Sequence, residues 1–124
     1  MPKFSNSSKS KLSTAHLLLQ AICYDAIEIT DFTVVCGHRG EAEQNKAVAE
    51  GKSQLKYPKS LHNHTPSLAV DLAPYDHGID WNDLEAFAHL AGIIKGIAHK
   101  KNIKIKWGGD WINFKDYPHF QLEE

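Results

Sequence analysis

Apolar residues recur at helical spacing in three segments of the chain. From Leu12 onwards, apolar residues spaced three or four positions apart predict an amphipathic helix over Ser13–Ile29. The segment EAEQNKAVAEG (41–51) predicts a second helix, with Gly51 just past its end. The longest helix is predicted in IDWNDLEAFAHLAGIIKGIAHKKN (79–102), with Asp80 or Asn82 as its N-cap and Asn102 near its C-terminus.

Short runs of β-branched and aromatic residues predict strands between these helices. These runs are DFTVVCG (31–37), LAVDLAP (68–74), IKIKW (103–107) and PHFQL (118–122), with a turn at Gly108 and Gly109. Residues 51–67, which carry glycine, prolines and serines, predict an irregular loop. Since the elements follow no regular βαβ repeat, we expect an α+β fold with a small, largely antiparallel sheet packed with helices. One domain over residues 1–124 is predicted, with residues 1–10 as a flexible N-terminus.

Composition narrows the class of protein. With 124 residues, 42% hydrophobic residues and a net charge of −1, the chain has the profile of one globular domain and lacks the basic surplus of a nucleic-acid binder. No run approaches the roughly 20 apolar residues of a membrane span. The polar N-terminus lacks an apolar signal region, so we expect synthesis in the cytoplasm, and nothing requires more than a monomer. Cys23 and Cys36 are expected to be reduced core thiols.

Asp71 is unusual because it lies in a run that predicts a buried strand. A buried carboxylate without a partner is costly, and a metal ion is one possible partner. Of the eight histidines, those on predicted helices or in a turn are expected to be surface or packing residues: His16, His77, His89 and His99. The remaining candidates are His38, His62, His64 and His119. Two histidines and a carboxylate form a recurring catalytic zinc centre, although scattered polar residues are the simpler interpretation of the spacing alone.

Two further residues have the right chemistry for hydrolysis. Asp116 lies three residues before His119 and is a candidate general base, or else an ordinary turn aspartate. Arg39 is the only arginine of the chain and follows Gly37 at the end of a predicted strand. Its planar guanidinium can polarise a carbonyl or clamp a carboxylate, and the alternative is a surface arginine.

Several ordered motifs together resemble the zinc peptidases of the M15 family. They are GHRGEAEQNKAVAEGKS, SLHNHTPSLAVDLAPY, IDWNDLEAF, KWGGDW and DYPHFQL. The resemblance is to the phage endolysin branch, the L-alanyl-D-glutamate peptidases, and extends from about residue 10 to residue 122. The D-Ala-D-Ala carboxypeptidases are relatives of this branch. The fold that the resemblance implies is also similar to that of the hedgehog signalling domain.

The resemblance implies roles for individual residues. The family pattern of Ser-x-His, Ala-x-Asp and an acidic residue three before a second histidine implies that His62, Asp71 and His119 hold Zn²⁺ and that Asp116 is the general base. Arg39 would polarise the scissile carbonyl, and Gln44 would support the arginine or the substrate. His64, seven residues before Asp71, matches the spacing of many members and is the alternative to His62.

The resemblance also implies a function. We expect a peptidoglycan L-Ala–D-Glu endopeptidase, a phage or prophage endolysin that is made in the host bacterial cytoplasm and acts on the cell wall after release. One alternative is a D-Ala-D-Ala carboxypeptidase. Another is a non-catalytic, zinc-containing module that binds muropeptides. The presence of both Asp116 and Arg39 favours an enzyme.

Overall fold

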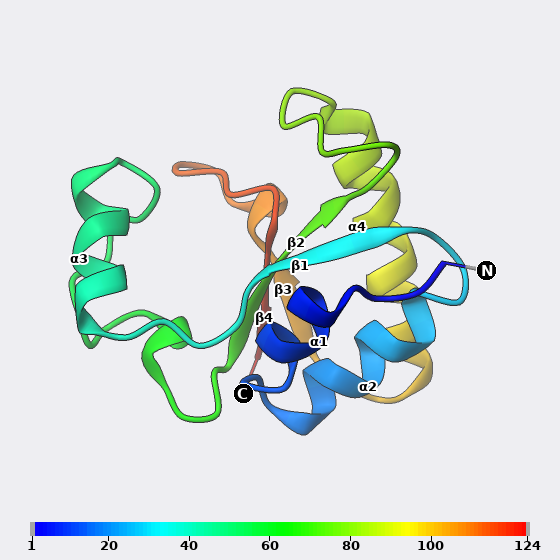
Figure 1. Ribbon diagram of the computed structural model, residues 1–124, viewed down its shortest axis with the longest axis horizontal. Helices are drawn as coiled ribbons and strands as arrows, with labels where there is room; N and C mark the ends of the chain where they lie inside the picture. Colours follow the sequence, from blue (N-terminus) through cyan, green and yellow to red (C-terminus); the bar gives the residue numbers. More distant parts are fainter. Residues whose placement is uncertain (1, 124) are drawn as a thin grey trace.

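The computed structural model describes residues 2–123 and gives this part of the chain four α-helices and one four-stranded sheet (Figure 1). The elements are α1 (Asn6–Leu12), α2 (Leu17–Ala26), β1 (Phe32–Cys36), α3 (Glu41–Ala49), β2 (Ala69–Pro74), α4 (Leu84–Lys100), β3 (Ile105–Trp107) and β4 (His119–Leu122). Two single turns of 3-10 helix, η1 (Leu61–Asn63) and η2 (Gly108–Asp110), complete the fold.

The sheet has the order β1-β2-β4-β3, and every neighbouring pair of strands is antiparallel. The predicted α+β fold with a small antiparallel sheet is therefore confirmed. β4, the last strand in sequence, lies between β2 and β3, so the C-terminal segment reaches the middle of the sheet. This places the final histidine of the chain beside the strand that carries Asp71.

Alternation along the strands gives the sheet two different faces. Paired positions on one face carry apolar side chains that join a single core with α2 and α4: Phe32, Val34, Val70, Leu72, Trp107 and Phe120. The opposite face carries Asp71 and His119, which are direct cross-strand partners. α3 stands away from the other three helices, at the left of Figure 1. α1, α2 and α4 thus contribute to the core on one face of the sheet, and Asp71 and His119 lie on the other face.

The N-terminal part differs from the prediction of one helix over Ser13–Ile29 and a flexible segment before it. α1 begins at Asn6, capped by the Ser5 side chain, and Phe4 is buried against Phe32 and Tyr24. The chain then leaves the helical path because the backbone around Ala15 pairs with Ser67. α2 starts only after His16, whose Nδ1 accepts a hydrogen bond from the Leu18 amide.

The predicted caps of the longest helix also need correction. Asp83, not Asp80 or Asn82, caps α4 through a hydrogen bond from the Ala86 amide to Oδ1. Asp80 instead accepts from the Asn82 amide within its own turn, which keeps that turn out of the helix. None of the helices in residues 2–123 combines the length and apolarity needed to cross a bilayer.

Candidate active site

The register of β2 and β4 brings the first two residues of the site together. Asp71 and His119 are Cα partners on adjacent antiparallel strands, so their side chains leave the same face of the sheet. His119 Nδ1 lies 3.4 Å from Asp71 Oδ1. Because both strands are central in the sheet, backbone hydrogen bonds on either side hold these two side chains in place.

The third residue, His62, comes from the 3-10 turn η1 in the loop before β2. Ser60 caps this turn by accepting a hydrogen bond from the His62 amide, at 3.2 Å. The Nδ1–H of His62 donates to the Gly37 carbonyl, at 2.8 Å. Gly37 is required there because a Cβ atom would collide with the Lys11 carbonyl and the Thr14 hydroxyl. His62 is consequently fixed with Nε2 pointing toward the sheet.

Nε2 of His62 meets both strand residues. It lies 3.2 Å from Asp71 Oδ1 and 3.3 Å from His119 Nδ1. One donor atom from each of the three side chains lies within 4.8 Å of the others, and His62 and His119 are buried. Two imidazole nitrogens and a carboxylate oxygen this close suit a divalent metal such as zinc, with one coordination position open for water.

A glutamine that the sequence analysis did not identify orients the second histidine. The Nε2–H of His119 donates to Gln121 Oε1, at 2.8 Å, which turns Nδ1 toward Asp71 and His62. Gln121 is two residues further along β4 and therefore on the same face of the strand. Its i, i+2 spacing from His119 is the signal that could have found it. A hydrogen bond to the non-coordinating nitrogen is the usual support of a metal-binding histidine.

The electrostatics of the metal-free site show how strongly these groups interact. Burial alone lowers the pKa of His62, but the Asp71 carboxylate and the Cys36 thiol outweigh it and raise that pKa to about 10. Burial likewise opposes ionisation of Asp71, yet the two histidines hold its pKa far below the usual range. Without metal, a proton on His62 therefore compensates the charge of Asp71. A metal ion at the same place supplies that compensation itself.

Asp116 lies beside this cluster, with Oδ2 3.9 Å from His119 Nδ1. Its backbone is packed onto Gly108, where a Cβ atom would collide with the Asp116 carbonyl, and its amide donates to the Gly108 carbonyl at 3.0 Å. Burial, followed by the nearby charge of Asp71, raises the pKa of Asp116 to about 6. A carboxylate with that pKa is suited to accept and return a proton near neutral pH.

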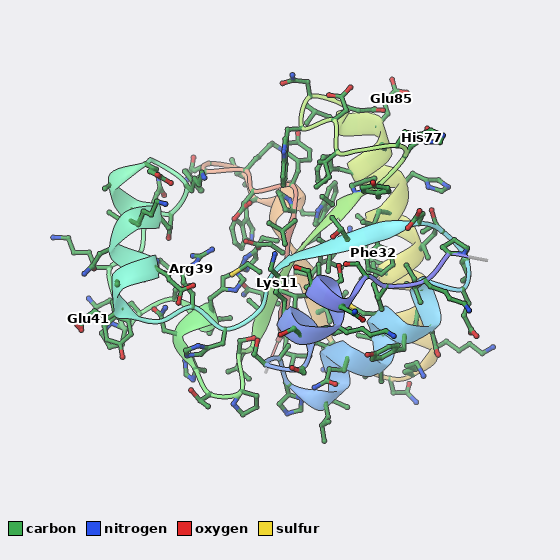
Figure 2. The ribbon with its side chains drawn as sticks, in the orientation of Figure 1. Lys11, Phe32, Arg39, Glu41, His77 and Glu85 are labelled. Atoms are coloured by element: carbon green, nitrogen blue, oxygen red, sulfur yellow. The ribbon has the colours of Figure 1, made fainter. Side chains whose placement is uncertain are left out.

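Arg39 faces the cluster from the segment between β1 and α3, where Figure 2 labels it. Its guanidinium donates to Asp71 Oδ2 at 3.4 Å and to Gln44 Oε1 at 2.9 Å. Its amide donates to the His62 carbonyl, at 2.8 Å, and its own carbonyl accepts from Asn63. The arginine is thus fixed to both the strand and the loop that carry the histidine–aspartate pair.

Gln44 is fully buried, contacts the Arg39 guanidinium and lines neither cavity described below. Its Nε2 donates to Ser53 Oγ, at 3.0 Å, and to the Leu55 carbonyl, at 2.6 Å. Asn63 also donates to Gln44 Oε1, at 3.3 Å. Gln44 therefore ties α3, the loop after it and η1 to the arginine.

The other sequence candidates lie outside the cluster. His64 is exposed, at the C-terminal end of η1, and His38 is half-buried, with its amide bound to Thr14 Oγ1. His77 is exposed near the start of α4, far from Arg39 in Figure 2. Cys23 is a free thiol in the core, as expected, but the expectation of a core position is wrong for Cys36. A register shift between Val34 and Cys36 places Cys36 opposite Asp71, with its Sγ 3.8 Å from His62 Nδ1.

Two cavities open onto the cluster. The first, of about 550 Å³, is lined near the cluster by His62, His119, Arg39, Asp116, Trp111 and Phe114. The second, of about 940 Å³, is lined by Cys36, Arg39, Asp71, Trp81, Phe114 and Asp116 among others. Because Arg39, Phe114 and Asp116 line both, the two cavities adjoin each other at the cluster.

Comparisons with known proteins agree with this geometry. A family model described as phage L-alanyl-D-glutamate peptidase matches residues 1–122. The L-alanyl-D-glutamate peptidase of Escherichia phage T5 is 39% identical over 118 residues, which span 93% of this chain and 85% of that protein. The peptidoglycan L-alanyl-D-glutamate endopeptidase CwlK of Bacillus subtilis (strain 168) is 28% identical over 102 residues, 74% of this chain and 60% of that protein.

A solved structure extends the likeness to three dimensions. The crystal structure of the Serratia marcescens L-Ala D-Glu endopeptidase ChiX matches with a TM-score of 0.83 and 30% sequence identity. The match covers 98% of this chain and 90% of the ChiX chain. The α+β fold, with a candidate His–Asp–His metal centre on the open face of the sheet, defines the class as a peptidoglycan peptidase. The chain belongs to the phage L-alanyl-D-glutamate peptidase family.

Proposed function

We propose that this chain is a zinc-dependent endopeptidase that cuts the L-Ala–D-Glu bond of peptidoglycan stem peptides as an endolysin. The single observation that supports it most is the convergence of His62, Asp71 and His119, beside Asp116, on one polar face of the sheet. We further propose that the chain is made in the cytoplasm of the host bacterium, acts on its wall after release, and works as a monomer.

The donor set fits zinc, and we propose His62, Asp71 and His119 as its three ligands. Each histidine has its outward nitrogen bound to an acceptor, Gly37 for His62 and Gln121 for His119, so each inner nitrogen is available. When bound, zinc supplies a Lewis acid that polarises the substrate carbonyl and lowers the pKa of a water molecule.

The surrounding residues then have distinct roles in hydrolysis. Asp116 accepts the proton of the attacking water and returns it to the leaving amine. Its burial, which raises its pKa to about 6 in the metal-free site, favours this role. The Arg39 guanidinium donates to the oxygen that becomes negatively charged in the tetrahedral intermediate. Gln44 keeps the guanidinium aimed at that position.

The test is digestion of purified peptidoglycan by the zinc-loaded protein, with mass spectrometry of the released fragments. We expect new D-glutamyl amino termini, and release slower by at least about 100-fold from an Asp116→Asn variant that still binds zinc. Release of terminal D-alanine alone would indicate a D-Ala-D-Ala carboxypeptidase. Binding of fragments without cleavage would indicate a muropeptide-binding module.

A further inference from the structure

In the proposed substrate, the L-Ala–D-Glu bond has a negative charge close to the reacting atoms. In stem peptides the D-glutamyl residue continues the chain through its γ-carboxyl group, so its α-carboxylate is free. That carboxylate is attached to the carbon next to the leaving nitrogen, so its oxygens lie within about 5 Å of the scissile carbonyl carbon. A charge that enters a partly enclosed cleft needs a partner, and the cationic residues in the cavity walls are the candidates.

Two cationic residues among residues 2–123 line both cavities of the site, Arg39 and Lys52. The guanidinium of Arg39 already donates to Gln44 and Asp71 and is only 14% exposed. Lys115 lines the second cavity alone, and its ammonium donates to the Gly109 carbonyl at 3.1 Å. Lys46 also lines the second cavity alone. Lys52 is thus the cation placed where the two cavities meet and free to change its partner.

The position of Lys52 is well defined although its ammonium is accessible. Its amide donates to the Ala47 carbonyl at 2.8 Å, and the next residue, Ser53, accepts a hydrogen bond from buried Gln44. The ammonium lies 3.3 Å from Glu50, and both side chains are substantially exposed, at 73% and 43%. Exposed ion pairs of this kind contribute little, so a substrate carboxylate can replace Glu50 at small cost.

We propose that Lys52 is a specificity-determining residue that binds the free α-carboxylate of the D-glutamyl residue and so distinguishes it from the amidated form, D-isoglutamine. The inference rests on the proposed function, since it assigns the leaving-group side of that reaction. D-isoglutamine has nearly the same shape but carries no charge at this position. Lys52 therefore favours the acid through an ion pair that the amide lacks.

The experiment compares two synthetic peptides that differ only at this group, L-Ala–γ-D-Glu–L-Lys–D-Ala and its D-isoglutamine counterpart. We expect the zinc-loaded wild type to have a kcat/KM about fivefold to tenfold higher for the acid than for the amide. Lys52→Gln is expected to bring this ratio close to one, mainly through loss of activity on the acid. Lys52→Arg retains the charge and is expected to keep the preference.

Lys59→Gln is the matched control, because it removes a lysine from the same loop at a position that lines neither cavity. It is expected to keep the wild-type ratio, and zinc content and thermal midpoint verify that each variant is folded. An unchanged ratio in Lys52→Gln, or a wild type without preference, overturns the assignment of Lys52 while cleavage still supports the proposed function. If the wild type cleaves neither peptide, the proposed function itself fails and the assignment falls with it.

Discussion

Nε2 of His62 lies 3.2 Å from Oδ1 of Asp71, and the two residues reach this contact from a loop turn and from a central strand. The strand holds the carboxylate rigidly, whereas η1 and the Gly37 carbonyl orient the imidazole. His64, only two residues away, is exposed and outside the cluster.

Substitution of each histidine tests the ligand assignment. His62→Ala is expected to lower zinc affinity by more than about 100-fold, since loss of even a supporting hydrogen bond costs 10- to 100-fold. His64→Ala is the matched control and is expected to bind zinc as the wild type does. The measurement is competitive titration with a chromogenic chelator. Loss of affinity in His64→Ala, with His62→Ala unaffected, would reverse the assignment.

Gln121 provides a test of how His119 is oriented. Gln121→Ala removes the acceptor for His119 Nε2–H and is expected to weaken zinc binding by about 10- to 100-fold. Gln121→Glu keeps an acceptor at the same position and is expected to retain most of the affinity. The same chelator titration measures both. Equal affinities for Gln121→Ala and wild type would show that the strand alone orients the imidazole.

Asp116 is predicted to determine the acidic limb of the pH–activity profile. Burial and Asp71 raise its pKa to about 6 without metal, and a bound cation lowers it. Activity is therefore expected to fall at a pH at or below about 6, where Asp116 becomes protonated. Asp116→Asn is expected to keep zinc and fold and to lose about 10²- to 10⁴-fold in kcat. If the variant loses zinc instead, Asp116 is a ligand and not the base.

Gln44 is predicted to act on catalysis through Arg39. Gln44→Leu has similar volume but leaves Arg39 and the Ser53–Leu55 segment without their partner, which is expected to cost about 1–3 kcal/mol of stability. We expect kcat to fall with little change in KM, because Gln44 is buried away from substrate. Steady-state kinetics and denaturant unfolding measure the two effects. A change confined to KM would place Gln44 in substrate binding.

The metal-free protein is expected to lose stability as the pH rises above neutral. The folded pKa of His62, about 10, exceeds the ordinary value near 6.5, so the folded state retains a proton that the unfolded state releases. The contribution of this proton to the free energy of unfolding is complete below pH 6.5. Above pH 6.5 it falls by at most about 1.4 kcal/mol per pH unit, and it is lost as the pH passes about 10. Unfolding of chelator-treated protein between pH 6.5 and 8 measures the slope.

His62→Gln provides the control for that slope, because it removes the titrating group and is expected to flatten the dependence. Zinc-loaded wild type is expected to show the opposite trend, with affinity rising as protons leave the ligands. A metal-free wild type whose stability is constant from pH 6.5 to 8 would contradict the raised pKa of His62.

Much of the local structure was predictable because periodicity records which face of each element is buried. The strand around Asp71, the antiparallel character of the sheet and the position of the longest helix all follow from spacing and turn residues. The break between α1 and α2 was not predictable in this way. It depends on pairing of Ala15 with Ser67, which is distant in sequence.

The sequence by itself determined which kinds of side chain were available to the site: histidines, a strand aspartate, a second acid and one arginine. Only the tertiary structure decided that His62 and not His64 meets Asp71, that Gln121 supports His119 and that Gln44 is buried behind Arg39. The physical reason is that metal geometry depends on distances of a few ångströms between residues far apart in the chain. Strand register and loop hydrogen bonds set those distances, and both result from the folded core as a whole.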